Sequence, residues 1–286
     1  MNTTSSGDHR AYSAMASEHY ENFPVASWLL PASLRSAIAT IYAFARKADD
    51  FADEGELEAS ERIALLDDYR HKLDIIRQGK HTDDPLFLNL AVTINSHKLP
   101  WQAFYDLLSA FRQDVHQHRY KNYAELLDYC SRSANPVGLL LLHLVNHATP
   151  ELVEKSNAIC SALQIINFLQ DIAIDYNKGR IYLPLDELKK FAVTEAHIQD
   201  RQFDQHWQSL IRYQLDRVQA LMLSGADLPN ALHGRMKYEI RATVTSGLHV
   251  IKLLQQRNQT GFTNQPRLQA RDWVKIGFRT LIYPYS

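Results

Sequence analysis

The chain has 286 residues, of which 45% are hydrophobic and 22% charged, a composition typical of a globular protein with a sizeable core. Its formal net charge of −1 at pH 7 does not favour binding to nucleic acid or to an anionic membrane through bulk charge. The longest strongly apolar run, residues 137–142, is far shorter than the roughly 20 residues needed to span a bilayer.

The apolar periodicity predicts helices along the whole chain. Residues 1–10 are polar and predict a flexible start, and a first helix is expected between Pro31 and Gly55, residue types that can begin and end a helix. Further helices are expected at 58–78, 84–96, 101–118, 123–147, 151–176, 203–224, 232–256 and 270–281. With no series of strands, no linker and no repeat, the sequence predicts one all-α domain over residues 1–286, with residues 270–286 as its C-terminal helix and tail.

Two kinds of site are disfavoured by the glycines and cysteines. The ten glycines are scattered, which excludes the closely spaced glycines of a P-loop or of a dinucleotide-binding fingerprint. Any phosphate must therefore be held by side chains and metal ions. The only cysteines, Cys130 and Cys160, predict reduced thiols in a cytoplasmic setting, without a disulfide framework or a zinc site.

The first acidic cluster lies at the end of the first predicted helix. Asp49 and Asp53 are four residues apart, so their carboxylates share a helical face with about 5–6 Å between the Cβ atoms. Asp49 falls on the apolar stripe of Ile38, with Tyr42 and Arg46 along its edge. A solvated helix end is the alternative interpretation. A buried carboxylate would instead need a cation or a hydrogen-bond partner.

The second acidic cluster lies on a helix that is apolar on most sides. Gln164, Asn167, Asp171 and Asp175 share one narrow face, and no charged residue occurs between residues 156 and 170. Such a helix is expected to be central, with its polar strip lining an internal cavity. The alternative is a buried polar network with a structural role only. Two acidic pairs in apolar surroundings suggest a divalent cation, and oxygen ligands alone suit Mg²⁺.

A basic segment follows the second cluster directly. Gly179 can end the helix, and Lys178 and Arg180 flank it. The guanidinium group of arginine can bind a diphosphate through two parallel hydrogen bonds. A salt bridge to a nearby aspartate is the competing explanation for either cation.

These motifs resemble those of the squalene/phytoene synthase family of all-α isoprenoid synthases, helical bundles around a central cavity. The similarity extends roughly from His19 to Arg279. The first signature comprises HYENF at 19–23, LLP at 29–31 and IYAFARKADD at 41–50. The second comprises QIIN at 164–167, Asp171, Asp175 and RIY at 180–182.

The resemblance implies a Mg²⁺-dependent site that ionises a prenyl diphosphate. Its implied metal ligands are Asp49, Asp53, Asn167, Asp171 and Asp175, and the four aspartates together with Tyr42 are the implied catalytic residues. Contacts with the diphosphate or the prenyl chain are implied for His19, Asn22, Phe23, Arg46, Gln164, Arg180, Tyr182 and Tyr238. Tyr129 and Asn135 are candidates for positioning a water molecule, although Asn135 could equally stabilise a kink at Pro136.

Two departures from the family pattern point to a subgroup. Many members carry Arg and Glu where this chain has Gln170 and Ile174. The patterns at 19–27, 133–138 and 167–176 resemble the bacterial hydroxysqualene synthases of the hopanoid/squalene pathway, which convert presqualene diphosphate to hydroxysqualene. This implies a presqualene diphosphate synthase and a hydroxysqualene dehydrogenase as pathway partners. The alternatives are a head-to-head prenyl transferase, such as a presqualene diphosphate, squalene or phytoene synthase, and a non-catalytic relative that acts in assembly.

The C-terminal segment allows two interpretations. Residues 273–283 mix apolar, aromatic and basic side chains. Such a segment is most often the last core helix of a domain. It could instead lie on a membrane surface and make a peripheral contact that helps to release a water-insoluble product.

Overall fold

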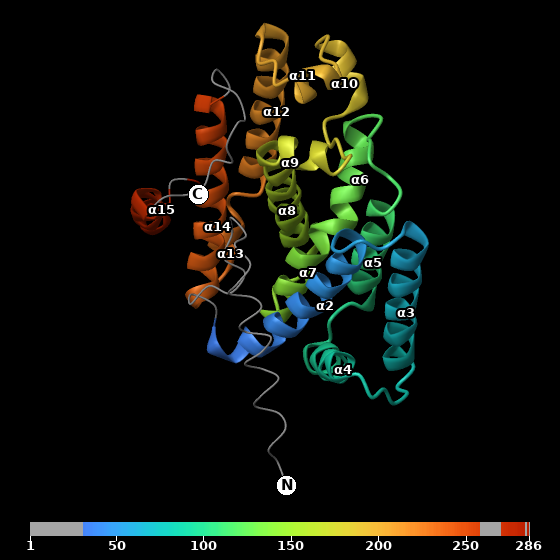
Figure 1. The fold of residues 1–286 in the computed structure, drawn as a ribbon. Helices are drawn as coiled ribbons and strands as arrows, with labels where there is room; N and C mark the ends of the chain where they lie inside the picture. Colours follow the sequence, from blue (N-terminus) through green and yellow to red (C-terminus); the bar gives the residue numbers. More distant parts are fainter. Residues whose placement is uncertain (1–30, 258–269, 284, 286) are drawn as a thin grey trace. The chain divides into compact units, whose positions relative to one another are not determined.

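The computed structural model describes residues 31–257, 270–283 and 285, and within these ranges the chain is helical, without a β-strand (Figure 1). The all-α prediction is confirmed. Within these ranges, the residues up to His116 with 136–148 form one compact unit, and residues 117–135 with those from Thr149 onward form another. That the whole chain acts as one domain stays a prediction, and the expected flexible start at 1–10 lies outside the described residues.

The first unit is built around a cluster of aromatic side chains. Its elements are η1 (Ala32–Leu34), α2 (Arg35–Asp53), α3 (Ala59–Arg77), α4 (Pro85–His97), α5 (Trp101–Asp114) and most of α7 (Asn135–Leu144). The fully buried ring of Phe44 on α2 stacks on Tyr69 with 5.0 Å between centroids and meets Phe104 edge-on at 5.4 Å. Aromatic pairs of this kind add about 0.5–1.5 kcal/mol each to the hydrophobic gain of burial. They fix the rotation of α2 about its axis.

The second unit is arranged around one long helix. Its elements are α6 (Tyr123–Ser133), α8 (Pro150–Gln170), α9 (Ile172–Asn177), α10 (Leu185–Lys190), α11 (Glu195–Gln199), α12 (Gln205–Ser224), α13 (Leu228–Ala231), α14 (Gly234–Arg257) and α15 (Ala270–Ile282). Helix α8 packs against α6, α12 and α14, as Figure 1 shows. The prediction that this helix is central is therefore confirmed for its own unit.

Two of the predicted helices are each divided in the structure. The stretch 123–147 breaks at Ala134, because Pro136 is favourable in the first turn of a new helix, α7. The stretch 151–176 breaks at Asp171, whose φ of −104° and ψ of 10° leave the helical region. The short helices α10, α11 and α13 were not predicted, since elements of four to six residues carry too little periodicity to be recognised.

None of the helices in the described ranges combines the length and the apolar character needed to cross a bilayer.

Candidate active site

The polar strip of the second unit continues across the break between α8 and α9. The backbone N–H of Asp171 donates to the carbonyl of Asn167 at 2.9 Å, and that of Asp175 donates to the carbonyl of Asp171 at 2.8 Å. The four-residue spacing of these side chains therefore survives the change in helix direction. All three are partly exposed.

The side-chain amide oxygen of Asn167 is an unsatisfied hydrogen-bond acceptor. Its Oδ1 atom is buried and accepts no hydrogen bond from any of the described residues. A buried acceptor left in this state costs about 1–3 kcal/mol unless another donor or a cation satisfies it. An oxygen atom directly beside the acidic strip suits a hard cation such as Mg²⁺.

The two residues that depart from the family pattern lie in opposite environments. Gln170 is only 4% exposed, whereas Ile174 is 44% exposed. The apolar pattern of residues 163–174 predicts that Ile174 belongs to the apolar covering of this helix, and this expectation is wrong. The break at Asp171 reorients α9, so a residue that would be internal on one continuous helix lies at the surface.

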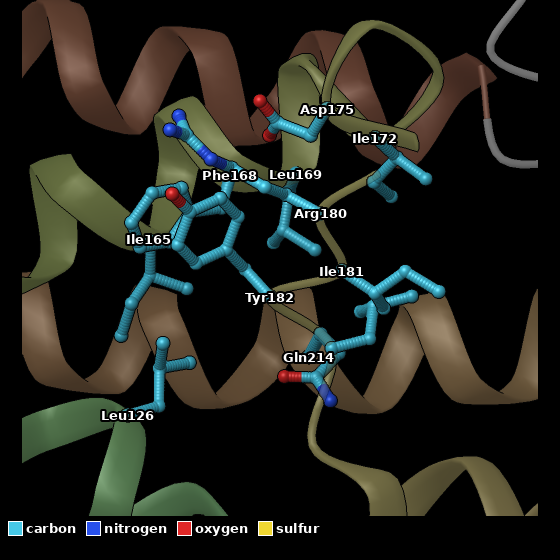
Figure 2. Close-up of a pocket in the computed structure, with 11 residues that line it drawn as sticks. Leu126, Ile165, Phe168, Leu169, Ile172, Asp175, Arg180, Ile181, Tyr182 and Gln214 are labelled. Atoms are coloured by element: carbon cyan, nitrogen blue, oxygen red, sulfur yellow. The ribbon is translucent and has the colours of Figure 1, made fainter. Parts of the chain in front are cut away.

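A small pocket lies next to the strip and has one charged end (Figure 2). Asp175 and Arg180 lie at this end, and most of the remaining lining is apolar, from Phe168, Leu169, Ile172 and other side chains. The free space of about 10 Å³ holds roughly one water molecule. The pocket therefore places a carboxylate and a guanidinium group beside an apolar wall.

The apolar wall belongs to a cluster of four aromatic rings. Phe168 stacks on Tyr182 with 3.7 Å between centroids and an interplanar angle of 4°. Tyr129 lies 6.1 Å from each of these rings, and Tyr120 lies 5.6 Å from Tyr182. Tyr129 and Tyr182 were predicted as site residues, while Tyr120 was missed because no motif in its vicinity marks it. The faces of such rings attract cations.

The loop that carries Arg180 is held by Arg119, which no sequence motif marks as a site residue. Arg119 donates from Nη1 to the carbonyl of Gly179 at 2.5 Å, and its Nε and Nη2 donate to the carboxylate of Glu195 at 3.0 Å each. The hydrogen bonds from Arg119 keep the pKa of Glu195 below its usual value. The N–H of Ile181 also donates to the carbonyl of His118 at 3.0 Å. Arg119 and the carbonyl of His118 thus hold the residues on the two sides of Arg180, and the separation of 60 residues between Arg119 and Gly179 leaves no local signal in the sequence.

In the first unit, α2 presents a second polar strip. At 100° per residue, Tyr42, Arg46, Asp49 and Asp53 lie within a narrow sector, and all four are partly exposed. The side chain of Asp49 is 42% exposed. The expectation that Asp49 is buried on the same face as Ile38 is therefore wrong: Ile38 is 7% exposed, whereas Asp49, further along α2, lies at the exposed edge of the packed face.

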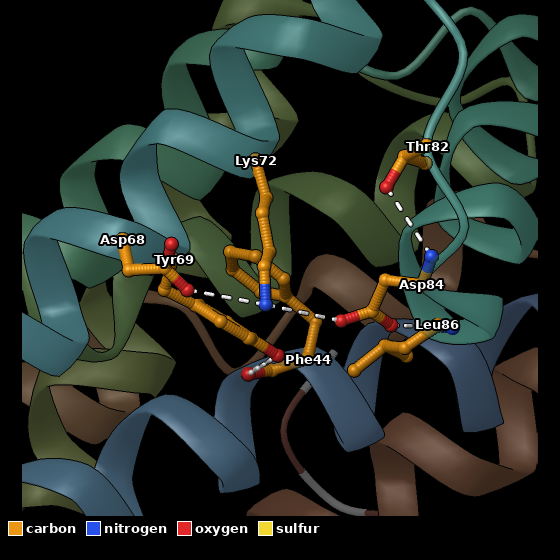
Figure 3. A network of polar contacts seen from close by, with 7 residues as sticks. All are labelled: Phe44, Asp68, Tyr69, Lys72, Thr82, Asp84 and Leu86. Atoms are coloured by element: carbon orange, nitrogen blue, oxygen red, sulfur yellow. Dashed lines mark hydrogen bonds and ion pairs between the residues drawn. The ribbon is translucent and has the colours of Figure 1, made fainter.

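Polar contacts around Lys72 and Tyr69 join α3 to α4 and to α2 (Figure 3). The Nζ atom of Lys72 on α3 lies 3.1 Å from Asp68 and 3.4 Å from Asp84, and the Asp84 side chain also caps the first turn of α4. The hydroxyl of Tyr69 donates to the carbonyl of Phe44 at 3.4 Å. These contacts anchor the packed face of α2 to α3.

The cation of this strip, Arg46, is held among carboxylates. Its guanidinium nitrogens lie 2.8 Å from Asp50, 3.4 Å from Asp49 and 3.7 Å from Glu54. Burial lowers the pKa of Arg46, but the charges of Asp49 and Asp50 outweigh burial, and the net effect is an increase. Arg46 is thus permanently charged. Asp50, which was not predicted as a site residue, makes the shortest of these contacts.

Two predicted residues, Asn135 and Tyr238, lie apart from the strips or have another partner. Asn135 accepts a hydrogen bond through Oδ1 from the Ser161 hydroxyl on α8 at 2.8 Å, which favours its role at the α6–α7 junction. Tyr238 on α14 is 42% exposed and lies 5.9 Å from the guanidinium group of Arg241. Gln164 is half-buried on α8. His19, Asn22 and Phe23 lie outside the described residues.

Neither strip alone forms a ready-made metal cage. Among the residues that the structure describes, no three His, Cys, Asp or Glu side chains are grouped to hold an ion. This arrangement still suits Mg²⁺, which usually binds one or two carboxylates and completes its coordination with water and substrate phosphate.

Comparison with known proteins identifies the family. The model of the squalene/phytoene synthase family matches residues 16–274. A phytoene synthase of Arthrospira platensis is 29% identical over 96% of this chain and 91% of its own, and a hydroxysqualene synthase of Zymomonas mobilis is 41% identical over 62% and 59%. The crystal structure of squalene synthase HpnC from Alicyclobacillus acidocaldarius superposes with a TM-score of 0.81 at 34% identity, covering 88% of this chain and 94% of that one. The chain therefore belongs to the squalene/phytoene synthase family.

Proposed function

We propose that the protein converts presqualene diphosphate to hydroxysqualene and diphosphate in squalene/hopanoid biosynthesis. The observation that carries the proposal is the pocket in which Asp175 and Arg180 adjoin a cluster of aromatic rings. The free space holds only about one water molecule, so the support comes from the lining: charged groups that suit a leaving diphosphate lie next to aromatic rings that suit the remaining carbocation. The 41% identity to a hydroxysqualene synthase over 62% of the chain supports this substrate.

The first step breaks the bond between carbon and the diphosphate oxygen, and the electron pair leaves with the diphosphate. Arg46 and Arg180 are proposed to bind the charge that develops on the leaving group, because fixed cations stabilise such a transition state without reorganisation. Asp49, Asp53, Asn167, Asp171 and Asp175 would hold Mg²⁺, which supplies Lewis-acid stabilisation of the same oxygen atoms. The unsatisfied Oδ1 atom of Asn167 fits this assignment.

The second step concerns the cyclopropylcarbinyl cation. Phe168 and Tyr182, the two rings that line the pocket, are the residues proposed to stabilise it while it rearranges, with Tyr129 and Tyr120 packed against them. A water molecule then donates its oxygen to the cation and loses a proton, so that one C–O bond is broken and one is formed. Tyr129 is the proposed residue that positions this water. No hydride donor enters the reaction, in keeping with the absence of a dinucleotide fingerprint in the sequence.

The departures at 170 and 174 are part of the proposal. A neutral Gln170 in a position that is 4% exposed avoids the high cost of burying an arginine charge. Ile174 removes a negative charge one residue before Asp175. We propose that fewer charges around the second strip tune the site to a single diphosphate substrate.

A head-to-head prenyl transferase is the second candidate, and the phytoene synthase of Arthrospira platensis, which aligns over 96% of the chain, favours it. Purified protein incubated with presqualene diphosphate and Mg²⁺, without NADPH, should yield hydroxysqualene. Parallel incubations with farnesyl and geranylgeranyl diphosphate test the transferase. Squalene, phytoene or no product in place of hydroxysqualene would refute the proposed reaction. A non-catalytic assembly protein would in addition show no Mg²⁺-dependent thermal shift with a diphosphate analogue.

We also propose pathway neighbours and a cellular location for the protein. Presqualene diphosphate synthase and hydroxysqualene dehydrogenase are the proposed neighbours in the pathway, because they supply the substrate and consume the product. A cytoplasmic location with peripheral contact to a membrane suits a substrate and a product that are both lipids.

Replacing Arg119 with glutamine should lower kcat about tenfold and change KM little. The variant loses the clamp on Gly179 and the bidentate pair with Glu195, so the Arg180 guanidinium would be less well positioned for the transition state. Steady-state kinetics with presqualene diphosphate measures the split between kcat and KM. The matched control is Arg112→Gln, which removes another exposed arginine–carboxylate pair, with Asp67. Equal kcat values in the two variants would contradict the positioning role.

A further inference from the structure

The C-terminal helix α15 is docked on the rest of its unit through one face. Asp272, Ile276 and Thr280, spaced by four residues, are each at most 6% exposed, and α15 packs against α14. Asp272 Oδ1 lies 3.2 Å from Nε2 of His249, and the hydroxyl of Tyr283 donates to the carbonyl of Ala226 at 2.5 Å. The expectation of a last core helix is therefore correct for this face.

The opposite face of α15 is apolar and open to solvent. Phe278, Leu281 and Ile282 are 65%, 69% and 62% exposed. A surface helix normally turns a polar face outward, because exposed apolar side chains gain nothing from water. Large side chains gathered on one outer face indicate a surface that is covered in the working protein.

A basic groove runs between α14 and α15 beside this apolar face. It encloses about 570 Å³, and its charged lining consists of Lys252, Lys275 and Arg279 against a single carboxylate, Asp272. The side chain of Asp272 is buried and paired with His249. The three cations are on the exposed side chains, so the groove presents net positive charge to whatever approaches the apolar face.

We propose that the outer face of α15 and the basic groove form a docking surface for an anionic phospholipid bilayer. The groove accepts the phosphate of a lipid headgroup, while Phe278, Leu281 and Ile282 enter the boundary between headgroups and acyl chains. Charge complementarity favours this occupant over a second copy of the chain, because an isologous dimer would bring two positive grooves together. The inference goes beyond the proposed reaction and does not depend on it.

Flotation of the full chain with vesicles tests the surface. We expect binding to vesicles that contain phosphatidylglycerol, weaker binding in high salt, and little binding to pure phosphatidylcholine. Leu281→Asp should abolish flotation, and Lys275→Gln combined with Arg279→Gln should weaken it about twenty-five-fold, roughly fivefold for each charge removed. The matched control is Val92→Asp on α4, because Val92 is also 65% exposed but lies on another helix.

Three outcomes would overturn the inference. The first is equal flotation of Leu281→Asp and the wild-type protein. The second is inorganic phosphate binding at the groove without any vesicle binding, which would identify a site for a free anion. The third is a wild-type dimer in lipid-free sedimentation that Leu281→Asp dissociates, which would assign the face to a second copy. Thermal unfolding of each variant separates loss of binding from loss of folding.

Discussion

Replacing Asp171 with asparagine should reduce the turnover of presqualene diphosphate at least about a hundredfold, while the protein stays folded. Asparagine keeps the shape of the side chain but removes the charge that is proposed to hold Mg²⁺ at the junction of α8 and α9. The backbone hydrogen bonds of residue 171 to Asn167 and from Asp175 do not involve the carboxylate, so the junction itself should persist. Asp49→Asn should reduce turnover to a similar extent. Arg46 should stay in place in this variant, because it keeps its shorter contact with Asp50.

The measurement is a Mg²⁺ titration of single-turnover rates for Asp171→Asn, Asp49→Asn and a control. Asp50→Asn is the matched control because Asp50 lies in the same acidic cluster and contacts Arg46, but is not a proposed ligand. It should slow the reaction without changing the Mg²⁺ concentration at half-maximal rate, whereas the two ligand variants should require more Mg²⁺. An unchanged Mg²⁺ dependence in Asp171→Asn would remove this residue from the metal site. Far-UV circular dichroism checks that each variant is folded.

The sequence could predict what depends on periodicity. The narrow polar face of α8 and the central position of this helix in its unit both follow from the alternation of side-chain types, and the structure bears them out. Periodicity assumes one continuous axis, however. At Asp171 the helix axis changes direction without a proline or a glycine to mark the break. The predicted burial of Ile174 was therefore wrong.

Contacts between distant segments were beyond the reach of the sequence. Arg119 meets Gly179 and Glu195 only after the chain has folded, and an isolated arginine in a polar stretch has no distinguishing pattern. The exposure of Asp49 was also missed, because Ile38 and Asp49 share an angular position on α2, but only Ile38 is buried. Local rules thus identified the candidate ligands, and tertiary packing determined their exposure.

Gly225→Ala should destabilise the protein by about 3 kcal/mol, among the larger effects of a single methyl group. Gly225 ends α12 with a φ of −102°, a conformation that alanine adopts readily, so backbone strain is not the cause. An added Cβ would lie 2.3 Å from the backbone oxygen of Lys155 and 2.9 Å from Cγ1 of Ile159, both on α8. A helix backbone cannot move aside as a flexible side chain can. Thermal unfolding should show a Tm lower by roughly 10 °C.

Two further glycines provide the controls for this prediction. Gly277→Ala on α15 adds a Cβ with no atom within 4 Å, so it should stabilise the protein by up to about 1 kcal/mol through helix propensity. The Tm of Gly247→Ala should lie between those of the other two variants, because the atom nearest to the added Cβ, at 2.7 Å, is the flexible end of the Met222 side chain. The next neighbour of the added Cβ is Leu163, at 3.2 Å. Leu163 directly precedes Gln164, a residue of the polar strip, so a shift of Leu163 should also lower turnover. Equal Tm values for Gly225→Ala and Gly277→Ala would show that close packing on α8 does not limit stability, and that the strip is held by other contacts.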